Sequence, residues 1–330
     1  MINEYLQRKI NDSYDVLKLA SEMSLEYYQK PLILTYSGGK DSDVLVQLAL
    51  ECLKPNEFEV LNSHTTVDAP ETVYYIRDRF KELNEKGVKT TIHYPHYPDG
   101  RPMSMWSLIV DTEIPPTRIQ RYCCKKLKET SVPNRFIAVG VRASESSGRK
   151  GRNVFATRGK NKKEAYYYYY SHVREVFDDD KVRRSEGGVE PNTSGVWDCT
   201  FIANAKKNKD LICNPIYSWT DSDVWEFIHG RGMKYNPLYD KGFLRVGCIG
   251  CPMAGNQVQE LEMYPKYKQN YINAFERMLK KRKAEGKDDS KGHWKDAESM
   301  YKWWIQDDSI EGQMDIFEFL EEDTENEKVD

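Results

Sequence analysis

Apolar residues occur at helical spacing in some segments and as short runs in others, and together these patterns predict alternating helices and strands. Residues 2–28 carry apolar side chains at near-helical spacing and predict an amphipathic N-terminal helix. Helical patterns also cover residues 41–53 and begin near Pro70, where proline suits the first turn. Short apolar runs predict strands at 31–36, 58–62, 88–93 and 136–140. This alternation predicts an α/β fold, an open, mostly parallel twisted sheet with helices on both faces.

The carboxyl ends of such strands are where ligands bind in open α/β sheets. Glycine-containing loops follow Tyr36 and Val139, at the ends of the first and fourth predicted strands. Because parallel strands end at the same edge of a sheet, we expect both loops to lie at that edge. The sequence therefore places the candidate site there.

The rest of the chain is less regular. Residues 221–229 predict a short helix capped by Thr220 or Asp221. We expect two further helices, at about 258–284 and 294–306, to pack back on the core. From the N-terminus, we expect a helix at 1–29, a ligand-binding domain at 30–255 with a basic, tyrosine-rich insertion at about 143–200, a helical segment at 256–317, and an acidic disordered tail at 318–330.

Composition is that of a soluble, folded chain. The 330 residues are 39% hydrophobic and 31% charged, with 22 Tyr and 7 Trp, too many aromatics for a disordered chain. The sequence shows no apolar run of about 20 residues and no secretory signal, so we expect a cytoplasmic location and no membrane partner. The net charge of −3 is unevenly placed. An excess of positive charge over 142–184 is compatible with a solvated loop or with an anion-binding surface.

The segment Ser37-Gly38-Gly39-Lys40-Asp41-Ser42 lies where the first strand gives way to a helix. Glycines allow positive φ and close approach of a ligand, and a helix start offers amide N–H groups and a positive dipole end to an anion. The lysine adds charge, and the two serines add hydroxyl donors. The segment is not a Walker-type loop, whose glycine and Ser/Thr positions are filled here by Leu34 and Asp41. The alternative is an ordinary strand–helix turn.

This segment resembles the pyrophosphate-binding loop of the PP-loop ATP pyrophosphatases, and within them the chain resembles the phosphoadenosine-phosphosulfate (PAPS) reductase family. Four further segments support the resemblance: 64–72 with its P-E-T ending, 140–146 as G-x-R-x-x-E-S, 214–225 as N-P-I-x-x-W-T-x-x-D-V-W, and 236–242. The resemblance implies an adenine nucleotide alpha-hydrolase-like fold that binds an adenosine nucleotide, either ATP or an adenylyl sulfate.

Candidate site residues follow from the resemblance. It implies that the residues of 37–42, together with Asp68, Arg142 and Glu145, bind the nucleotide, and that Lys40, Asp41 and Arg142 take part in catalysis. Arg142 suits bidentate contact with phosphate or sulfate oxygens, and the alternative is a surface ion pair. Glu145 can hold that guanidinium or a ribose hydroxyl. Asp221 and Asp223 are interpreted as a helix cap and first-turn charges.

Four of the seven cysteines form a pattern, the adjacent pair Cys123-Cys124 and the C-x-x-C pair Cys248 and Cys251. This set resembles the ligands of the [4Fe–4S] cluster in adenylyl-sulfate reductases. Zinc and unliganded thiols are the alternatives. Cys52 is expected to face the core. Cys199 and Cys213 are expected to be buried apolar fillers, with a persulfide carrier as the alternative.

This sequence differs from the sulfonucleotide reductases in one respect, the catalytic nucleophile. Those reductases use a cysteine on a C-terminal segment, and no cysteine follows Cys251 here. The interpretation it favours is an iron–sulfur sulfurtransferase, as in DNA phosphorothioation, that adenylates an acceptor with ATP–Mg²⁺ and supports sulfur transfer. The alternatives are a sulfonucleotide reductase and a non-catalytic nucleotide-binding subunit.

The partners are less defined by the sequence. The resemblance implies a cysteine desulfurase as sulfur donor. The tyrosine run at 166–170, beside basic residues, can stack on the bases of DNA or RNA or alternate along a strand. The sequence leaves the oligomeric state open.

Overall fold

The computed structural model describes residues 2–129, 135–145, 154–157, 182–185, 188–191, 211–287 and 294–305. The chain divides into two compact units. The first unit is Met1–Met103 with Cys124–Cys248, and the second is Ser104–Cys123 with Ile249–Asp330. None of the helices in the described ranges is both long and apolar enough to cross a membrane.

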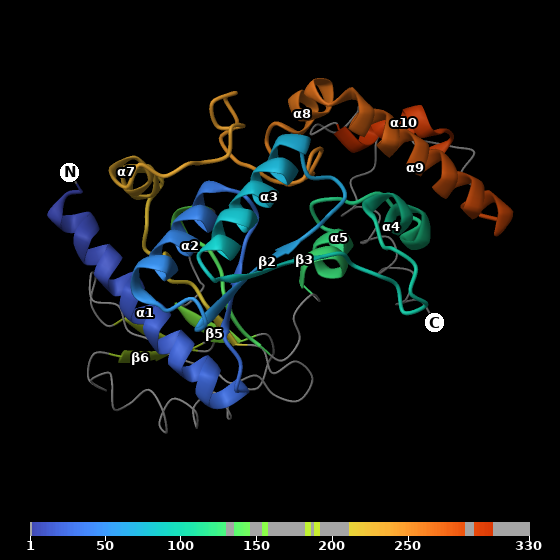
Figure 1. Ribbon diagram of the computed structural model, residues 1–330. Coiled ribbons are helices and arrows are strands. Elements are labelled where there is room, and N and C mark those ends of the chain that lie inside the picture. Colours follow the sequence, from blue (N-terminus) through green and yellow to red (C-terminus); the bar gives the residue numbers. More distant parts are fainter. Residues whose placement is uncertain are drawn as a thin grey trace. The chain divides into compact units, whose positions relative to one another are not determined.

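A six-stranded sheet forms the centre of the first unit (Figure 1). Its strands, in spatial order, are β3 (Lys89–His93), β2 (Phe58–Ser63), β1 (Leu32–Thr35), β4 (Phe136–Ala138), β8 (Leu211–Cys213) and β5 (Phe155–Thr157). All neighbours are parallel except β5, which pairs antiparallel with β8. In β1, Leu34 lies opposite Val60 on one side and Ala138 on the other. The predicted open, mostly parallel sheet is confirmed.

Side chains alternate between the two faces of this sheet, as the period of an extended strand requires. In β1, Leu32 and Leu34 join the main core cluster, whereas Ile33 lies in a smaller cluster. Leu61 and Ile137 of the neighbouring strands complete that smaller cluster. The central strands β1 and β4 are therefore apolar on both faces, which explains why they read as continuous apolar runs.

Among the described residues of the first unit, the longer helices that accompany the sheet are α1 (Glu4–Tyr28), α2 (Lys40–Cys52), α3 (Pro70–Glu85) and α7 (Asp221–Gly230). α2 contacts both α1 and α7. Asn3 caps α1 by accepting a hydrogen bond from the amide of Leu6, and Pro70 occupies the first turn of α3. The remaining short elements are a π-helical turn (Lys125–Glu129), a 3₁₀ turn (Ala143–Glu145) and the β6 (Val182–Ser185) and β7 (Gly188–Pro191) hairpin. The short helix α5 (Tyr122–Cys124) spans the boundary between the units.

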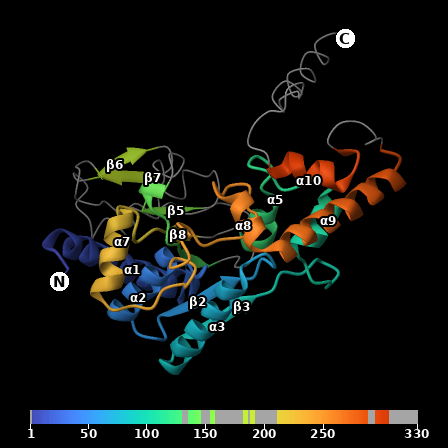
Figure 2. The same ribbon diagram turned by 90° about the horizontal axis from the view of Figure 1, so that it is seen from above.

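The second unit is helical, with α4 (Met105–Thr112), α8 (Gln257–Met263), α9 (Pro265–Ala284) and α10 (Ala297–Ile305) (Figure 1). Figure 2 shows α8, α9 and α10 in a second view. Tyr271 of α9 is at its centre. Its ring lies 4.9 Å from that of Trp106 on α4 and 4.5 Å from that of Trp304 on α10. The indole N–H of Trp304 donates to the carbonyl of Pro116 at 2.6 Å. The buried indole N–H therefore has a hydrogen-bond acceptor within this aromatic core.

The predicted elements of the first unit are present with ends shifted by one or two residues. One C-terminal prediction is wrong: the continuous helix expected at 258–284 is broken at Tyr264, and Pro265 begins the new helix α9. Proline lacks the amide that a helix interior needs, so the break follows from its chemistry. The tyrosine run at 166–170, Cys199 and the acidic tail lie outside the described residues.

Candidate functional site

The loop after β1 has a backbone that only glycine can adopt without strain. Gly38 has φ of +73°, and a Cβ placed there would lie 2.9 Å from Cγ1 of Ile76. The side-chain amide of Asn236 donates to the carbonyl of Gly38 at 3.0 Å. The loop is therefore tightly packed against α3 and fixed from a distant part of the chain.

The loop directs a set of backbone amides to the start of α2. Gly39 is the N-cap residue of α2, and no side chain caps this helix by a hydrogen bond. The amide of Ser37 donates to the Ser42 hydroxyl at 3.3 Å, and the amide of Lys40 donates to the Tyr239 hydroxyl at 2.9 Å. Within the described ranges, the amides of Gly38, Gly39, Asp41 and Ser42 donate no hydrogen bond. Together with the helix dipole, they provide a place for an anion.

Lys40 brings a buried cation to this place. Lys40 is 5% exposed, and its Nζ lies 3.1 Å from Oδ1 of Asp221 and 3.4 Å from the carbonyl oxygen of Leu244. The rings of Tyr239 and Trp225 lie 5.4 Å and 6.0 Å from Nζ. A cation that is withdrawn from water is stabilised by such carboxylate, carbonyl and aromatic neighbours.

Arg142, from the loop after β4, brings a second buried cation. Its Nη2 donates to Oδ1 of Asp221 at 3.0 Å, and its Nη1 donates to the Ser144 hydroxyl at 3.2 Å. Its Nε lies 2.6 Å from Oδ1 of Asp41, but the pair lacks hydrogen-bond geometry. Arg142 is 3% exposed, so its guanidinium is buried, whereas Asp221, its partner in one of these pairs, is largely exposed.

The two glycine loops meet as expected. A Cβ at Gly140 would lie 3.0 Å from the carbonyl oxygen of Asp41, so only glycine lets the loop after β4 approach the first turn of α2 this closely. The structure therefore brings together Lys40, Asp41 and Arg142, the three candidate catalytic residues.

The two carboxylates of this group differ in their acidity. Burial raises the pKa of Asp41 above its ordinary value, although Arg142 and Lys40 act in the opposite direction. Burial also acts to raise the pKa of Asp221, but hydrogen bonding and charge from Lys40, followed by Arg142, bring it below its ordinary value. Asp221 therefore carries a negative charge at neutral pH between two cations.

The remaining candidate nucleotide residues lie differently. Glu145 accepts a hydrogen bond from the backbone amide of Arg142 at 3.0 Å, so this contact fixes the loop and leaves the guanidinium to other partners. Asp68 follows β2, where its Oδ2 accepts from the amide of Thr65 at 3.0 Å and lies 3.8 Å from Nδ1 of His64. Asp68 borders a small cavity of about 40 Å³ at the end of that strand.

Two residues of this region have a role that local sequence patterns do not indicate. The pattern around Asp221 predicts only a first-turn charge, because its two cationic partners come from other elements. Asp223 fits the same interpretation, since it forms the capping box with Thr220 and pairs with the buried Lys9 at 2.6 Å. Asp43, one turn into α2, is the second residue without a local signal.

Asp43 is a fully buried carboxylate beneath the loop. It accepts hydrogen bonds from the hydroxyls of Tyr36 at 2.6 Å and Tyr75 at 3.0 Å, and Nε of Arg79 lies 3.9 Å away. Burial raises its pKa to about 7, against the lowering effects of these three neighbours. The group ties the end of β1 to α2 and α3.

The four patterned cysteines are divided between the units. Cys124 and Cys248 belong to the first unit, and Cys123 and Cys251 to the second. Cys248 contacts the Thr65 hydroxyl at 3.6 Å. Over the described ranges, no three His, Cys, Asp or Glu side chains are grouped so that they could hold a metal ion. The ligand set stays a prediction.

The two other described cysteines are structural. Cys213 of β8 is completely buried, as expected, and burial raises the pKa of its thiol. Cys52 packs half-buried against the main core, and burial raises its pKa to about 12. Neither thiol is in a setting that favours a thiolate.

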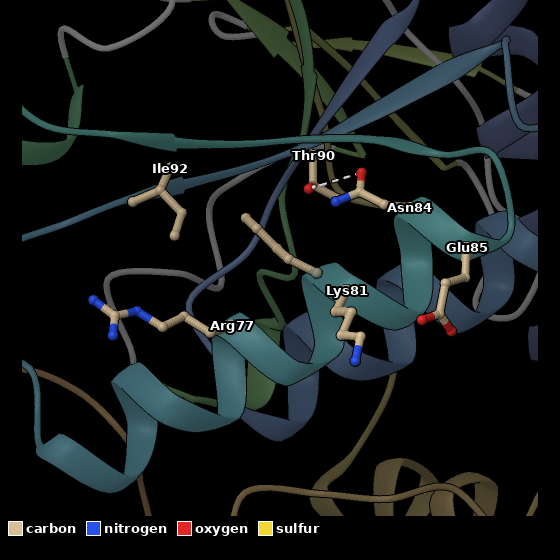
Figure 3. Close-up of a pocket in the computed structure, with 7 residues that line it drawn as sticks. Arg77, Lys81, Asn84, Glu85, Thr90 and Ile92 are labelled. Carbon is tan, nitrogen blue, oxygen red and sulfur yellow. Dashed lines mark hydrogen bonds between the residues drawn. The ribbon is translucent and has the colours of Figure 1, made fainter.

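A groove of about 580 Å³ lies elsewhere, between α3 and the edge strand β3 (Figure 3). Its lining includes Phe80 and Ile92, and the hydroxyl of Thr90 donates to Asn84 at its edge. Arg77 and Lys81 of α3 also line it, and in Figure 3 the Lys81 side chain points away from β3. None of the candidate site residues lines this groove.

A parallel sheet whose first loop offers glycine amides, with buried cations at the same edge, defines a class of α/β proteins that present backbone N–H groups and positive charge at their strand ends. Within that class, the chain belongs to the phosphoadenosine phosphosulfate reductase domain family, which matches residues 31–254. The resemblance drawn from the sequence motifs is confirmed at the level of the family.

Similar proteins carry several different names. An uncharacterized protein of Methanocaldococcus jannaschii is 24% identical over 84% of this chain and 56% of its own length. A sulfate adenylyltransferase subunit 2 of Sulfurimonas denitrificans is 24% identical over 63% of this chain and 59% of its own. An adenosine 5'-phosphosulfate reductase of Anoxybacillus flavithermus is 39% identical, but over 16% of this chain and 22% of its own. The chain thus spans little more than half of the relatives that it matches at length.

Solved structures are similar at a lower level. A PAPS reductase from Candida auris, in a phosphate complex, has a TM-score of 0.42 and 14% identity, and the match covers 72% of this chain and 87% of that one. A U34-tRNA thiolase from Methanococcus maripaludis with its [4Fe–4S] cluster has a TM-score of 0.33 and 11% identity, with 87% and 81% covered. At these scores neither similarity establishes a ligand or an activity.

Proposed function

We propose that this protein binds ATP–Mg²⁺ in its first unit, transfers the adenylyl group to an acceptor with release of pyrophosphate, and so prepares the acceptor to receive sulfur. The observation that carries the proposal is the meeting of Lys40 and Arg142, two buried cations, beside the loop amides at the start of α2. Burial of cations is costly unless an anion balances them, so the arrangement is suited to polyphosphate.

The residues supply the chemistry in three ways. The amides of the loop and the ammonium of Lys40 hold the β- and γ-phosphates and stabilise the negative charge that collects on departing pyrophosphate. Arg142 offers two N–H groups to phosphate oxygens in a fixed geometry, which orients the α-phosphorus toward the acceptor oxygen. Magnesium binds oxygen ligands, and Asp41, whose buried Oδ1 has no hydrogen bond in the described structure, would supply one.

The name of one relative supports adenylyl chemistry. The Sulfurimonas denitrificans protein is called a sulfate adenylyltransferase subunit, and its similarity extends over 63% of this chain. Sulfate therefore joins DNA and RNA as an acceptor to be tested, with sulfide supplied as the sulfur source. The nucleic-acid acceptor and the desulfurase donor rest on the resemblance to DNA-phosphorothioation sulfurtransferases alone.

A [4Fe–4S] cluster suits the donor chemistry of Cys123, Cys124, Cys248 and Cys251, because four thiolates are its ordinary ligands. When bound, such a cluster supplies a site for sulfur or electron exchange. Zinc is the alternative for the same thiolates. Anaerobic purification followed by analysis of iron, labile sulfide and zinc separates the two.

A pyrophosphate-release assay tests the proposal. The full chain, purified without oxygen, receives ATP and Mg²⁺ with sulfate, DNA or RNA in turn, and with sulfide present as the sulfur source. We expect release with one acceptor, a loss of at least about 100-fold in Lys40→Ala, and no loss in Lys54→Ala, which removes an exposed lysine. Absence of release with all three acceptors, in the presence of sulfide, contradicts the proposal.

A second function, reduction of adenylyl sulfate, is favoured by the local 39% identity to an adenosine 5'-phosphosulfate reductase. It lacks a cysteine nucleophile among residues 252–330. Sulfite release from adenylyl sulfate with a dithiol reductant tests it. ATP binding without turnover in either assay would instead indicate a nucleotide-binding subunit.

A further inference from the structure

One carboxylate oxygen in the candidate site is shared by two cations. Oδ1 of Asp221 lies 3.1 Å from Nζ of Lys40 and 3.0 Å from Nη2 of Arg142. The side chains of the two cations are only 6% and 4% exposed, whereas that of Asp221 is 61% exposed. The cations are thus held inside the protein, and their shared anion reaches them from the surface.

The two cations keep other partners if this carboxylate leaves. Lys40 retains the Leu244 carbonyl and the Tyr239 ring, and Arg142 retains Asp41 and the Ser144 hydroxyl. Their positions therefore do not depend on Asp221 alone. What the departure removes is the negative charge between them.

The backbone that carries Asp221 is fixed independently of this ion pair. Thr220 and Asp223 form the capping box of α7, and Asp223 is anchored by Lys9, whose Nζ also donates to the carbonyl of Ser218 at 3.1 Å. Rotation of the Asp221 side chain can therefore break both ion pairs without moving the helix. The N-terminal dipole of α7 favours the carboxylate in either position.

We propose that Asp221 is a built-in competitor for the polyphosphate site: it neutralises Lys40 and Arg142 in the ligand-free protein, and a bound polyphosphate displaces it. This inference rests on the proposed function, because it assumes that polyphosphate binds at these two cations. With Asp41 and Asp221 the site carries two positive and two negative charges. Displacement of Asp221 exposes one net positive charge to the incoming anion.

The competition has a second consequence, for specificity. A ligand must bring enough negative charge to replace a carboxylate that already contacts both cations. Pyrophosphate or a nucleotide triphosphate can span Lys40 and Arg142 at once, whereas a monovalent anion replaces only one contact. Asp221 should therefore select against small inorganic anions in favour of polyphosphate.

Calorimetric titration of the full chain with inorganic pyrophosphate, in the absence of Mg²⁺, tests the inference. Asp221→Asn keeps the size of the side chain and removes the charge. Because a like charge beside a bound anion is strongly unfavourable, we expect pyrophosphate to bind Asp221→Asn about tenfold more tightly than the wild type. Asp221→Glu, which restores a carboxylate, should return the affinity toward the wild-type value.

Asp78→Asn is the matched control, since it removes one exposed negative charge from α3 of the same unit. We expect its affinity for pyrophosphate to stay within about twofold of the wild type, because exposed charges remote from a site are screened by salt. An equal gain in both variants would mean that net charge, and not the place of Asp221, sets the affinity, which overturns the inference.

Thermal unfolding gives a readout that is independent of binding heat. Without pyrophosphate, Asp221→Asn should unfold at a lower temperature than the wild type, because two buried cations lose their shared anion. Saturating pyrophosphate should raise its unfolding temperature by more than it raises that of the wild type. Equal ligand-free stabilities would contradict the neutralising role.

The failures of the two proposals are distinguishable. If the wild type binds pyrophosphate and Asp221→Asn binds it no better, Asp221 is not a competitor and the nucleotide site stands. If neither protein binds pyrophosphate, and Lys40→Ala behaves the same, both proposals are wrong.

Discussion

Replacing Asp43 with asparagine should change how the stability of the protein depends on pH. The carboxylate is completely buried, and burial raises its pKa from 3.8 to about 7 although Tyr36, Arg79 and Tyr75 act to lower it. Between these two pH values the folded state keeps a proton that the unfolded state has released. The free energy of unfolding should therefore fall as pH rises from about 4 to about 7, and then level off.

The size of the effect follows from the shift. One pKa unit corresponds to 1.36 kcal/mol, so the whole shift corresponds to about 4 kcal/mol, of which about 3 kcal/mol falls between pH 5 and pH 8. At pH 5, Asp43→Asn should be about 1 kcal/mol less stable than the wild type, because the amide disturbs the hydrogen bonds with Tyr36 and Tyr75. At pH 8 the order should reverse, because asparagine carries no buried charge.

Urea unfolding at pH 5, 6, 7 and 8, followed by circular dichroism, measures both proteins. The quantity to compare is the difference between their free energies of unfolding, since other titrating groups contribute equally to both and cancel. Asp78→Asn replaces an exposed residue of α3, so its difference in free energy of unfolding from the wild type should not change with pH in this way. A difference that stays constant from pH 5 to pH 8, or that moves in favour of the wild type as pH rises, would refute the reasoning.

Three further changes test other parts of the structure. Gly38→Ala should lower the free energy of unfolding by about 2 kcal/mol, because φ is +73° and Cγ1 of Ile76 lies 2.9 Å from the new methyl group, and it should weaken pyrophosphate binding at least tenfold by calorimetry. In the control Gly232→Ala, φ is +59° but the space around the new methyl group is open, so only the backbone strain should lower the free energy of unfolding. Lys9→Met should cost about 3 kcal/mol in urea unfolding, because it leaves the Asp223 carboxylate without its cation, and Asp223→Asn in the same chain should recover part of the loss. Trp304→Ala should cost about 3–5 kcal/mol in the same measurement, through the cavity that it leaves beside Tyr271.

The elements that the sequence predicts well are those whose burial pattern is local. β1 and α2 carry their signals within a few residues: an apolar run, two glycines and then helical spacing. The strand β8 is not predicted, because its three residues, Leu211–Cys213, are too few to establish a period, and its neighbours in the sheet come from far along the chain. Helix α4 escapes prediction for a related reason, since its eight residues begin with a serine cap but carry apolar side chains on most sides.

The sequence predicts which loops form the candidate site, because those loops follow the ends of parallel strands. Parallel strands finish at one edge, so the sequence alone predicts that the loops after β1 and β4 lie together, and the approach of Gly140 to Asp41 confirms that contact. Which side chains pair across the edge does not follow from the sequence, because the order of strands and the place of α7 depend on contacts between residues far apart in the chain. Lys9 and Asp223, separated by more than two hundred residues, are an example.

Asp221 illustrates why this limit matters for function. An aspartate in the first turn of a helix has a sufficient local explanation, because the helix dipole stabilises it. That explanation predicts an exposed carboxylate whose removal changes little. The structure adds two buried cations that meet the same oxygen, and a buried cation requires an anion whether or not a ligand is present. If Lys40 and Arg142 hold polyphosphate as proposed, their charge must also be balanced when the site is empty. Asp221, the first residue of α7, is the anion that both cations share, in addition to Asp41 beside Arg142.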